Sequence, residues 1–266
     1  MDETALAPPT DEVPLRYRLI RERQHAHAIL DRARLPQLYY AGITPEEYRG
    51  IKQRYLGLVT LVDRSIGAIL GCLAQFGLLD ETIIVHTSDH GDCLGAHQLF
   101  GKEVMFEEAA RVPYLIRMPG QGRSVRINQP ISHIDFLPTL LELLGQTKPP
   151  HCPGQSRVAL LKGGSMPPQS IFMEWSPNRA KTVKRSSLAT RRQAKRAMEE
   201  STRAVVTSDG WKLCLRDHDL NELYNLKVDP IEAHNLYYTG KYDAVIARGR
   251  DEIHRWQEMT EDRLKI

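Results

Sequence analysis

A long amphipathic segment begins near Glu46 and limits what the rest of the chain can form. Thr44 can cap this segment as a helix, Pro45 suits a first helical turn, and Gly77 is placed to end it. Apolar side chains recur at spacings of three and four, the period of a helix with one buried face. They are Ile51, Tyr55, Leu58, Val62, Ile66, Ile69 and Leu73. The pattern predicts a long helix that packs against a core.

Strand-like and helix-like segments alternate after this helix. Residues 82–87 are β-branched and almost uncharged, as in a buried strand, and they run into Ser88-Asp89-His90-Gly91. We expect a second strand at 112–118, a leucine-faced helix at 135–144 and a short strand at 170–175. This alternation is typical of an α/β fold with a mainly parallel sheet flanked by helices.

The pattern changes after residue 200. Short strands separated by turns are expected at 204–207, 211–215 and 222–226, followed by a helix from about Asp243 to Arg263. Strands this close together in the sequence predict a small antiparallel sheet closed by a helix.

We therefore divide the chain into four segments. Residues 1–45 form a charged N-terminal segment, with a possible helix over 15–35 whose apolar face is thin. Residues 46–178 form the α/β core, 179–201 a basic insertion, and 202–266 a small C-terminal antiparallel α+β subdomain.

The basic insertion carries eight Lys and Arg residues and no acid between Arg179 and Arg196. One interpretation is a solvated loop or charged helix face. The other is a basic lid that recruits an anionic substrate.

Composition excludes several classes of protein. Among 266 residues, 36 Lys and Arg against 33 Asp and Glu leave a net charge of +3, too small to indicate a nucleic-acid partner by itself. The longest uncharged run, Ser65–Leu79, is shorter than the about 20 residues of a membrane span, so we expect no membrane contact.

Cysteine usage and the start of the sequence bear on the compartment. No apolar run follows Met1, which argues against a secretory signal. The cysteines form no CxxC pair, and we expect reduced, mostly buried thiols and a cytoplasmic location. They are Cys72, Cys93, Cys152 and Cys214.

Asp89, His90 and Gly91 are the first candidates for chemistry. They follow a predicted strand, where ligands bind in open α/β sheets. A carboxylate and an imidazole suit divalent metals, and Gly91 permits the turn that would bring both to one ion. The alternative is a polar loop in which Asp89 caps the backbone.

The run TSDHGDCLGAHQLFGKEVMFEEAARVPYLIRMPG, residues 87–120, resembles the sulfatase family of the alkaline-phosphatase-like superfamily. The family pattern is a strand, S-D-H-G-x-x-L-G-x-H, a Lys thirteen residues after the Asp, Y/F-E-E-x-x-R-V-P and a strand ending in P-G. Residues 132–141, 222–236 and 55–73 resemble further family motifs, in the family's order, with Asn225 in place of an Asp. The resemblance covers about residues 35–236.

The resemblance implies roles for several residues. Asp89 and His90 would bind the active-site cation, Ca²⁺ or Mg²⁺, and Lys102 would contact a sulfate oxygen. The cation and the ammonium would neutralise charge that builds up on the transferring sulfuryl group. His97 would either touch the leaving group or be a structural loop histidine.

Other polar residues in these motifs have structural interpretations. We expect His133 to be structural and Asp135 to cap a helix. Glu107 and Glu108 are expected to be first-turn or ion-pairing acids rather than a catalytic pair.

The family nucleophile is absent from this sequence. Sulfatases make formylglycine from Cys or Ser in C/S-x-P/A-x-R followed by Thr-Gly, and no cysteine fits, Cys152 included. Residues 187–191 match the serine form but lack the Thr-Gly and lie downstream of the metal motif. The family's Asp-Asp pair is missing as well.

The sequence thus resembles the C-terminal half of a sulfatase, and we expect this chain alone to be inactive. A separate N-terminal half or a homodimer would cover an exposed apolar sheet edge, or the chain is a truncated gene product. Two alternatives remain: hydrolysis of phosphonate or phosphate esters, and a non-catalytic module that binds sulfated polyanions.

Overall fold

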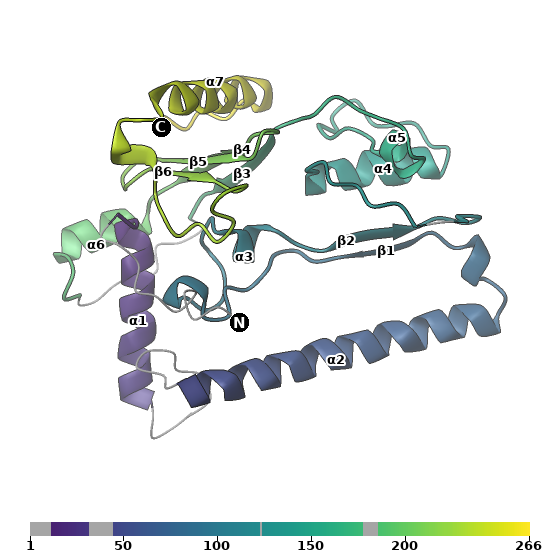
Figure 1. Cartoon of the computed structure of the whole chain (residues 1–266), viewed down its shortest axis with the longest axis horizontal. Helices are drawn as coiled ribbons and strands as arrows, with labels where there is room; N and C mark the ends of the chain where they lie inside the picture. Colours follow the sequence, from purple (N-terminus) through teal and green to yellow (C-terminus); the bar gives the residue numbers. More distant parts are fainter. Residues whose placement is uncertain (1–11, 32–44, 123, 178–185) are drawn as a thin grey trace. The chain divides into compact units, whose positions relative to one another are not determined.

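The computed structural model describes residues 12–31, 45–122, 124–177 and 186–266 (Figure 1). The chain divides into two compact units, and each is described by itself. The first joins residues 1–122 and 181–198, and the second joins 123–180 and 199–266. These bounds are not those of the four sequence segments, which remain a prediction.

The first unit contains the long helix and the first predicted strand. α1 packs against α6, a helix of the basic insertion. The helices are α1 (Leu15–Asp31), α2 (Pro45–Gln75), α3 (Glu107–Ala110) and α6 (Arg191–Met198); the strands are β1 (Ile84–Thr87) and β2 (Tyr114–Arg117); the 3-10 turns are η2 (Leu79–Glu81) and η3 (Ala96–Gln98).

β1 and β2 pair antiparallel, with Thr87 opposite Tyr114 and Ile84 opposite Arg117. The prediction of parallel pairing is therefore wrong for these two strands. The physical reason lies in their connection, because a parallel partner needs a crossover that returns along the whole strand, usually by a helix. Residues 88–113 contain only η3 and the four-residue α3, and the chain re-enters beside the point where it left.

The apolar face of α2 is exposed, although the sequence predicts it to be buried. Leu58, Val62 and Ile69 have 62%, 55% and 61% of their surface exposed. Within the described chain, Tyr48–Gln75 is also long and apolar enough to cross a membrane by length and composition. Charges within the helix, Asp63 and Arg64, would be costly in hydrocarbon.

The second unit consists of an antiparallel sheet with helices. The strand order is β3-β4-β5-β6, and all neighbours are antiparallel. The strands are β3 (Ile171–Trp175), β4 (Thr202–Val206), β5 (Trp211–Arg216) and β6 (Glu222–Asn225); the helices are α4 (Phe136–Leu143), α5 (Val158–Leu161) and α7 (Asp243–Thr260); the 3-10 turns are η4 (His133–Asp135) and η5 (Tyr237–Thr239).

This sheet confirms the predicted C-terminal antiparallel sheet and adds one strand to it. β3 was expected in the α/β core but pairs with β4, Trp175 opposite Thr202. A five-residue apolar strand carries no signal of its partner, which explains this error.

One face of the sheet packs against α7. Its core is a fully buried cluster of Val205, Leu213, Leu215, Leu223 and Ile253. Gly249 of α7 allows the close approach, because a Cβ there would lie 2.8 Å from Leu213 Cδ2.

The cysteines are free thiols, as expected. Cys93, Cys152 and Cys214 are buried, and Cys72 is exposed.

Candidate active site

The loop that leaves β1 is folded tightly on itself. The Asp89 carboxylate accepts a hydrogen bond from the His90 amide (2.9 Å), and the Ser88 hydroxyl donates to the His90 carbonyl (2.8 Å). Gly91 donates its amide to the Ala109 carbonyl (2.9 Å). A Cβ on Gly91 would lie 2.0 Å from the Glu108 carbonyl oxygen. Glycine is thus required for close passage beside α3.

Asp89, His90 and Lys102 meet beyond the end of β1. Asp89 Oδ2 lies 3.2 Å from His90 Nε2, and Lys102 Nζ contacts the same ring nitrogen. The pKa of Asp89 lies below its ordinary value, chiefly because the His90 amide bonds its carboxylate, and the charge of Lys102 acts in the same direction. The three residues on which the sequence places the chemistry are therefore together.

The tautomer of His90 suits a metal ligand. His90 Nδ1 lies 2.8 Å from the Gly91 carbonyl oxygen, which can only accept a hydrogen bond, so the neutral ring carries its proton on Nδ1. The lone pair of Nε2 then points toward Asp89 and Lys102. A backbone carbonyl bonded to the other ring nitrogen is the usual support of a metal-binding histidine.

These two donors provide only part of a coordination sphere. Ca²⁺ takes 6–8 oxygen ligands, and Mg²⁺ requires near-octahedral geometry. Among the residues that the structure describes, no group of three or more His, Cys, Asp and Glu could hold a metal. Asp89 and His90 would therefore supply at most two of the ligands of a divalent cation.

Lys102 lies at the end of a compact loop. The carboxylate of Asp92 accepts hydrogen bonds from the amides of Leu94 (2.7 Å) and Gly101 (3.1 Å), which closes the loop across nine residues. Lys102 follows directly, so the closure fixes where its side chain begins.

His97 has a different environment. Its ring stacks on Phe106, with centroids 3.6 Å apart and planes 3° apart, and Nε2 lies 3.5 Å from a Glu108 carboxylate oxygen. These contacts match a structural loop histidine, and no recorded contact joins His97 to Asp89, His90 or Lys102 in the described residues. Its role at the leaving group remains a prediction.

Asp135 serves the structure of the second unit. It forms a capping box with Ser132, and its carboxylate pairs with the buried guanidinium of Arg157 (2.8 Å). His133 lies in the same turn, and Glu107 and Glu108 begin α3. These positions agree with the structural interpretations of Asp135, Glu107 and Glu108, and the interpretation of His133 remains a prediction.

Sequence analysis missed a set of side chains on α1 and α2 that bind the Lys102 loop. Arg16, Arg21, Gln24 and Tyr48 each donate a hydrogen bond to a backbone carbonyl between residues 94 and 103. Carbonyl groups carry no sequence signal, so the side-chain pattern could not predict these bonds.

Two family models match the chain. The model described as Sulfatase matches residues 23–146, and the model described as N-sulphoglucosamine sulphohydrolase, C-terminal, matches residues 95–259. The second match alone covers more than half of the chain. The chain belongs to the sulfatase family.

Curated relatives of this sulfatase chain are longer than it is. The N-acetylglucosamine-6-O-sulfatase of Bacteroides thetaiotaomicron is 31% identical over 82% of the chain and 37% of the relative. The choline-sulfatase of Rhizobium meliloti is 29% identical over 73% of the chain and 34% of the relative. The chain thus spans less than two fifths of the length of these relatives.

Solved structures are similar in fold. A sulfatase solved with D-glucosamine-2-N,6-O-disulfate has a TM-score of 0.66 at 29% identity, over 82% of this chain and 42% of that chain. The phosphonate monoester hydrolase of Agrobacterium radiobacter has a TM-score of 0.69 at 25% identity, over 90% and 49%. The α/β class and the alkaline-phosphatase-like fold are confirmed.

The sulfatase chain contains no matching nucleophile in its described residues. Burial raises the pKa of the Cys214 thiol to about 12, so it is not a thiolate at neutral pH. Ser187, in the serine string, donates its hydroxyl to a Glu22 carboxylate oxygen (2.6 Å). This contact joins Ser187 to α1 within the first unit.

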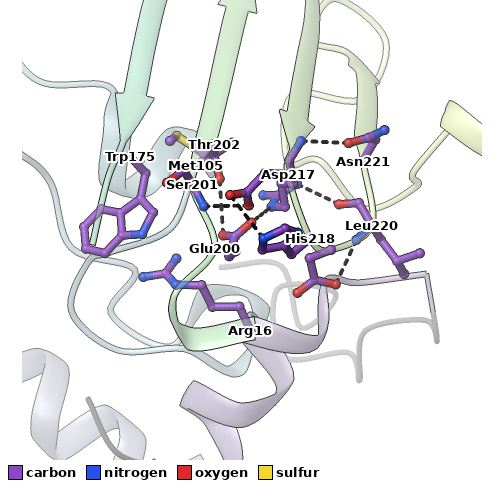
Figure 2. Close-up of polar contacts among 12 residues, drawn as sticks. Arg16, Met105, Trp175, Glu200, Ser201, Thr202, Asp217, His218, Leu220 and Asn221 are labelled. Carbon is purple, nitrogen blue, oxygen red and sulfur yellow. Dashed lines mark hydrogen bonds and ion pairs between the residues drawn. The ribbon is translucent and has the colours of Figure 1, made fainter. Parts of the chain in front are cut away.

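A second group of polar residues lies in the antiparallel sheet (Figure 2). Ser201 donates its amide to Asp217 (2.9 Å), and Arg216 donates its amide to Asn221 (2.8 Å). The Arg216 guanidinium pairs with Glu222 (2.5 Å) and Glu200 (3.3 Å), and all three side chains are buried. These bonds join neighbouring strands and their turns, which indicates a structural role.

Proposed function

We propose that this chain supplies the cation-binding and sulfate-contacting part of a sulfuric ester hydrolase. Asp89 and His90 would hold Ca²⁺ or Mg²⁺, and Lys102 would contact a sulfate oxygen. The observation that supports this is the proximity of the three side chains beyond β1. The Asp89 carboxylate and the Lys102 ammonium both lie next to Nε2 of His90. The substrate would be a sulfate ester.

The chemistry follows from charge. A bound divalent cation would polarise the sulfuryl group and stabilise the negative charge that develops on it. Asp89, ionised at neutral pH, supplies anionic oxygen, and His90 supplies Nε2 because its proton is held on Nδ1. Lys102 adds a fixed positive charge beside them, which favours an anionic ester and its transition state.

The nucleophile must come from elsewhere. In a complete site of this family, a formylglycine hydrate would attack sulfur and the alcohol would leave. We therefore expect the isolated chain to hydrolyse an aryl sulfate no faster than buffer. If the isolated chain hydrolysed the aryl sulfate and Asp89→Ala abolished this activity, the proposal that the nucleophile comes from elsewhere would be wrong.

The binding half of the proposal is testable on the chain alone. Ca²⁺ or Mg²⁺ should shift the NMR signals of the His90 ring, and Asp89→Asn should weaken that response. The same titration with Asp251→Asn, an exposed position on α7, is the control. An unchanged response in Asp89→Asn would refute the cation site.

Phosphonate or phosphate ester hydrolysis is the second candidate. It is favoured by the likeness to the phosphonate monoester hydrolase of Agrobacterium radiobacter. Aryl sulfate and aryl phosphonate assayed side by side, on this chain joined with the nucleophile-bearing part of a relative, would separate the two. The faster substrate identifies the reaction.

A non-catalytic role in binding sulfated polyanions has an observation of its own. α6 exposes Arg191 and Arg192 on one surface and buries Ala194 and Ala197 on the other. Affinity for heparin should then fall steeply as the salt concentration rises. It should be unchanged in Asp89→Ala and lost when the charges of Arg191 and Arg192 are both reversed. Heparin binding that is unchanged in the double variant Arg191→Glu with Arg192→Glu would exclude this role.

The apolar face of α2 is proposed to bind the part of the sulfatase core that this chain lacks. The chain spans 37% of the length of its N-acetylglucosamine-6-O-sulfatase relative, and α2 exposes the side chains that a core helix buries. Leu115 of β2 is exposed as well, which leaves the β1–β2 pair open to the same partner. A second copy of the chain is the competing occupant.

A cytoplasmic location remains a proposal, supported by the four free thiols. Fractionation of cells that express the chain, with a periplasmic and a membrane marker, tests it.

A further inference from the structure

The loop that carries Lys102, residues 94–105, is strained. Four residues that are not glycine have left-handed backbone conformations, namely Leu94 (φ 42°), His97 (φ 53°), Gln98 (φ 55°) and Glu103 (φ 80°). Such conformations cost free energy in residues with a Cβ and persist only where surrounding contacts hold them. The contacts that hold this loop are therefore expected to determine where Lys102 lies.

Three of the four strained residues have their carbonyl groups bound by side chains of α1 and α2. Tyr48 donates its hydroxyl to the Leu94 carbonyl (2.7 Å). Arg21 Nη2 donates to the His97 carbonyl (2.8 Å), and Arg16 Nη1 donates to the Glu103 carbonyl (2.6 Å). The donors thus bind where the backbone is least stable by itself.

Two further contacts join α1 to the same loop. Gln24 donates to the Phe100 carbonyl (2.9 Å), and the Tyr17 hydroxyl accepts the Met105 amide (2.8 Å). Burial, with a smaller effect from the charge of Arg18, lowers the pKa of Arg21 to about 10. Arg21 is thus partly buried where it donates to the loop.

We propose that Tyr48, Arg21 and Arg16 are positioning residues that hold the strained loop and so keep Lys102 beside His90. This rests on the proposed function of Lys102 as the contact for a sulfate oxygen. Arg16 and Arg21 precede residue 23, where the Sulfatase family match begins, so the role falls on a helix turn outside that match. They need not touch substrate.

Tyr48→Phe and Arg21→Met test the proposal on the full chain with inorganic sulfate as the probe. Losing one hydrogen bond should speed amide hydrogen exchange at residues 94–105 about two- to tenfold and weaken sulfate affinity by a similar factor, measured by NMR titration. Exchange in β5 should not change, which separates positioning from general destabilisation. Arg21→Lys, which keeps one donor, should restore part of both effects.

The matched controls lie on the same helices. Tyr55→Phe removes the hydroxyl of an exposed tyrosine of α2, and Arg23→Met removes a guanidinium from α1; both should behave as wild type. Faster exchange with unchanged sulfate affinity would make the contacts merely structural and overturn the proposal. Unchanged amide exchange at residues 94–105 in Tyr48→Phe and Arg21→Met would also overturn the proposal.

Lys102→Met separates this proposal from the function on which it rests. It should abolish the sulfate response but leave exchange in the loop at the wild-type rate. Sulfate binding that survives Lys102→Met would refute the proposed role of Lys102, and with it any positioning role for the three residues. Loss of sulfate binding in Lys102→Met and weakened sulfate binding in Tyr48→Phe, with loop exchange raised only in the latter, support both.

Discussion

Lys212 and Glu232 form an ion pair that is closed to solvent. Their charged groups lie 2.8 Å apart, and their side chains are 0% and 1% exposed. Glu232→Gln should cost about 3–5 kcal/mol of unfolding free energy, because it leaves the Lys212 ammonium buried without its counter-charge. Urea unfolding followed by circular dichroism measures this loss.

An exposed ion pair in the same unit provides the control. Arg248 lies 2.7 Å from Asp209, and both side chains are almost half exposed. Arg248→Met should cost less than about 1 kcal/mol, since water screens the pair. Equal costs for the two variants would show that Lys212 and Glu232 are not closed to solvent in solution.

Cys214 is expected to be inert in the folded chain. Burial, the largest influence, and the charge of Glu222 raise the pKa of its thiol to about 12, so hardly any thiolate exists even at pH 9. Iodoacetamide should label the exposed Cys72 first, and Cys214 only after unfolding, as read by mass spectrometry of peptides. Early labelling of Cys214 would mean that the sheet opens locally.

The meeting of Asp89, His90 and Lys102 could be predicted from the sequence, because the motif fixes their register with the strand. The need for glycine at position 91 could not be predicted, because it arises from the close approach of the Glu108 carbonyl oxygen, which is distant in sequence. The same holds for Tyr48 and Arg21, whose partners are backbone carbonyls. Side-chain patterns predict apolar contact but not these bonds.

At the scale of elements, periodicity located the helices well. α2 and α7 begin within one residue of the predicted starts at Glu46 and Asp243. Strand pairing was harder, because β1 is antiparallel to β2 where a mainly parallel sheet was expected, and β3 belongs to the C-terminal sheet and not to the α/β core. The alternation of apolar residues predicts which face of a strand is buried. Which strand pairs with it depends on distant parts of the chain.

The end of α7 is tied to β4 by a bidentate ion pair. Arg203 Nε and Nη2 donate to the two carboxylate oxygens of Asp262 (2.7 and 3.0 Å). The hydrogen bonds from Arg203, with a smaller one from Gln257, lower the pKa of Asp262 from 3.8 to about 2.

This lowered pKa makes the stabilising effect of Asp262 depend on pH. It is fully present above the unfolded pKa of about 4 and is lost as pH falls toward about 2. Asp262→Asn should therefore be less stable than wild type at pH 7, and the difference should vanish near pH 2. Asp251→Asn on the exposed face of α7 is the control. A difference that persists at pH 2 would show that Asp262 acts through packing.

At the scale of the whole molecule, the exposed face of α2 should decide what the chain binds. Leu58→Glu with Val62→Glu places two charges on that face, whereas Gln53→Glu adds a charge at an exposed polar position of the same helix. The double variant should lose co-purification with the nucleophile-bearing part of a relative, and Gln53→Glu should keep it, because charges at an apolar interface must be desolvated.

Sedimentation and vesicle binding distinguish the other occupants of that face. A homodimer would appear as a mass that doubles with concentration and returns to that of a monomer in Leu58→Glu with Val62→Glu. A membrane would appear as co-sedimentation with vesicles that the double variant loses, although Asp63 and Arg64 oppose insertion. If the double variant still co-purifies with the nucleophile-bearing part of a relative, the partner would instead bind the open β1–β2 pair. Leu115→Glu would then be the variant that tests that surface.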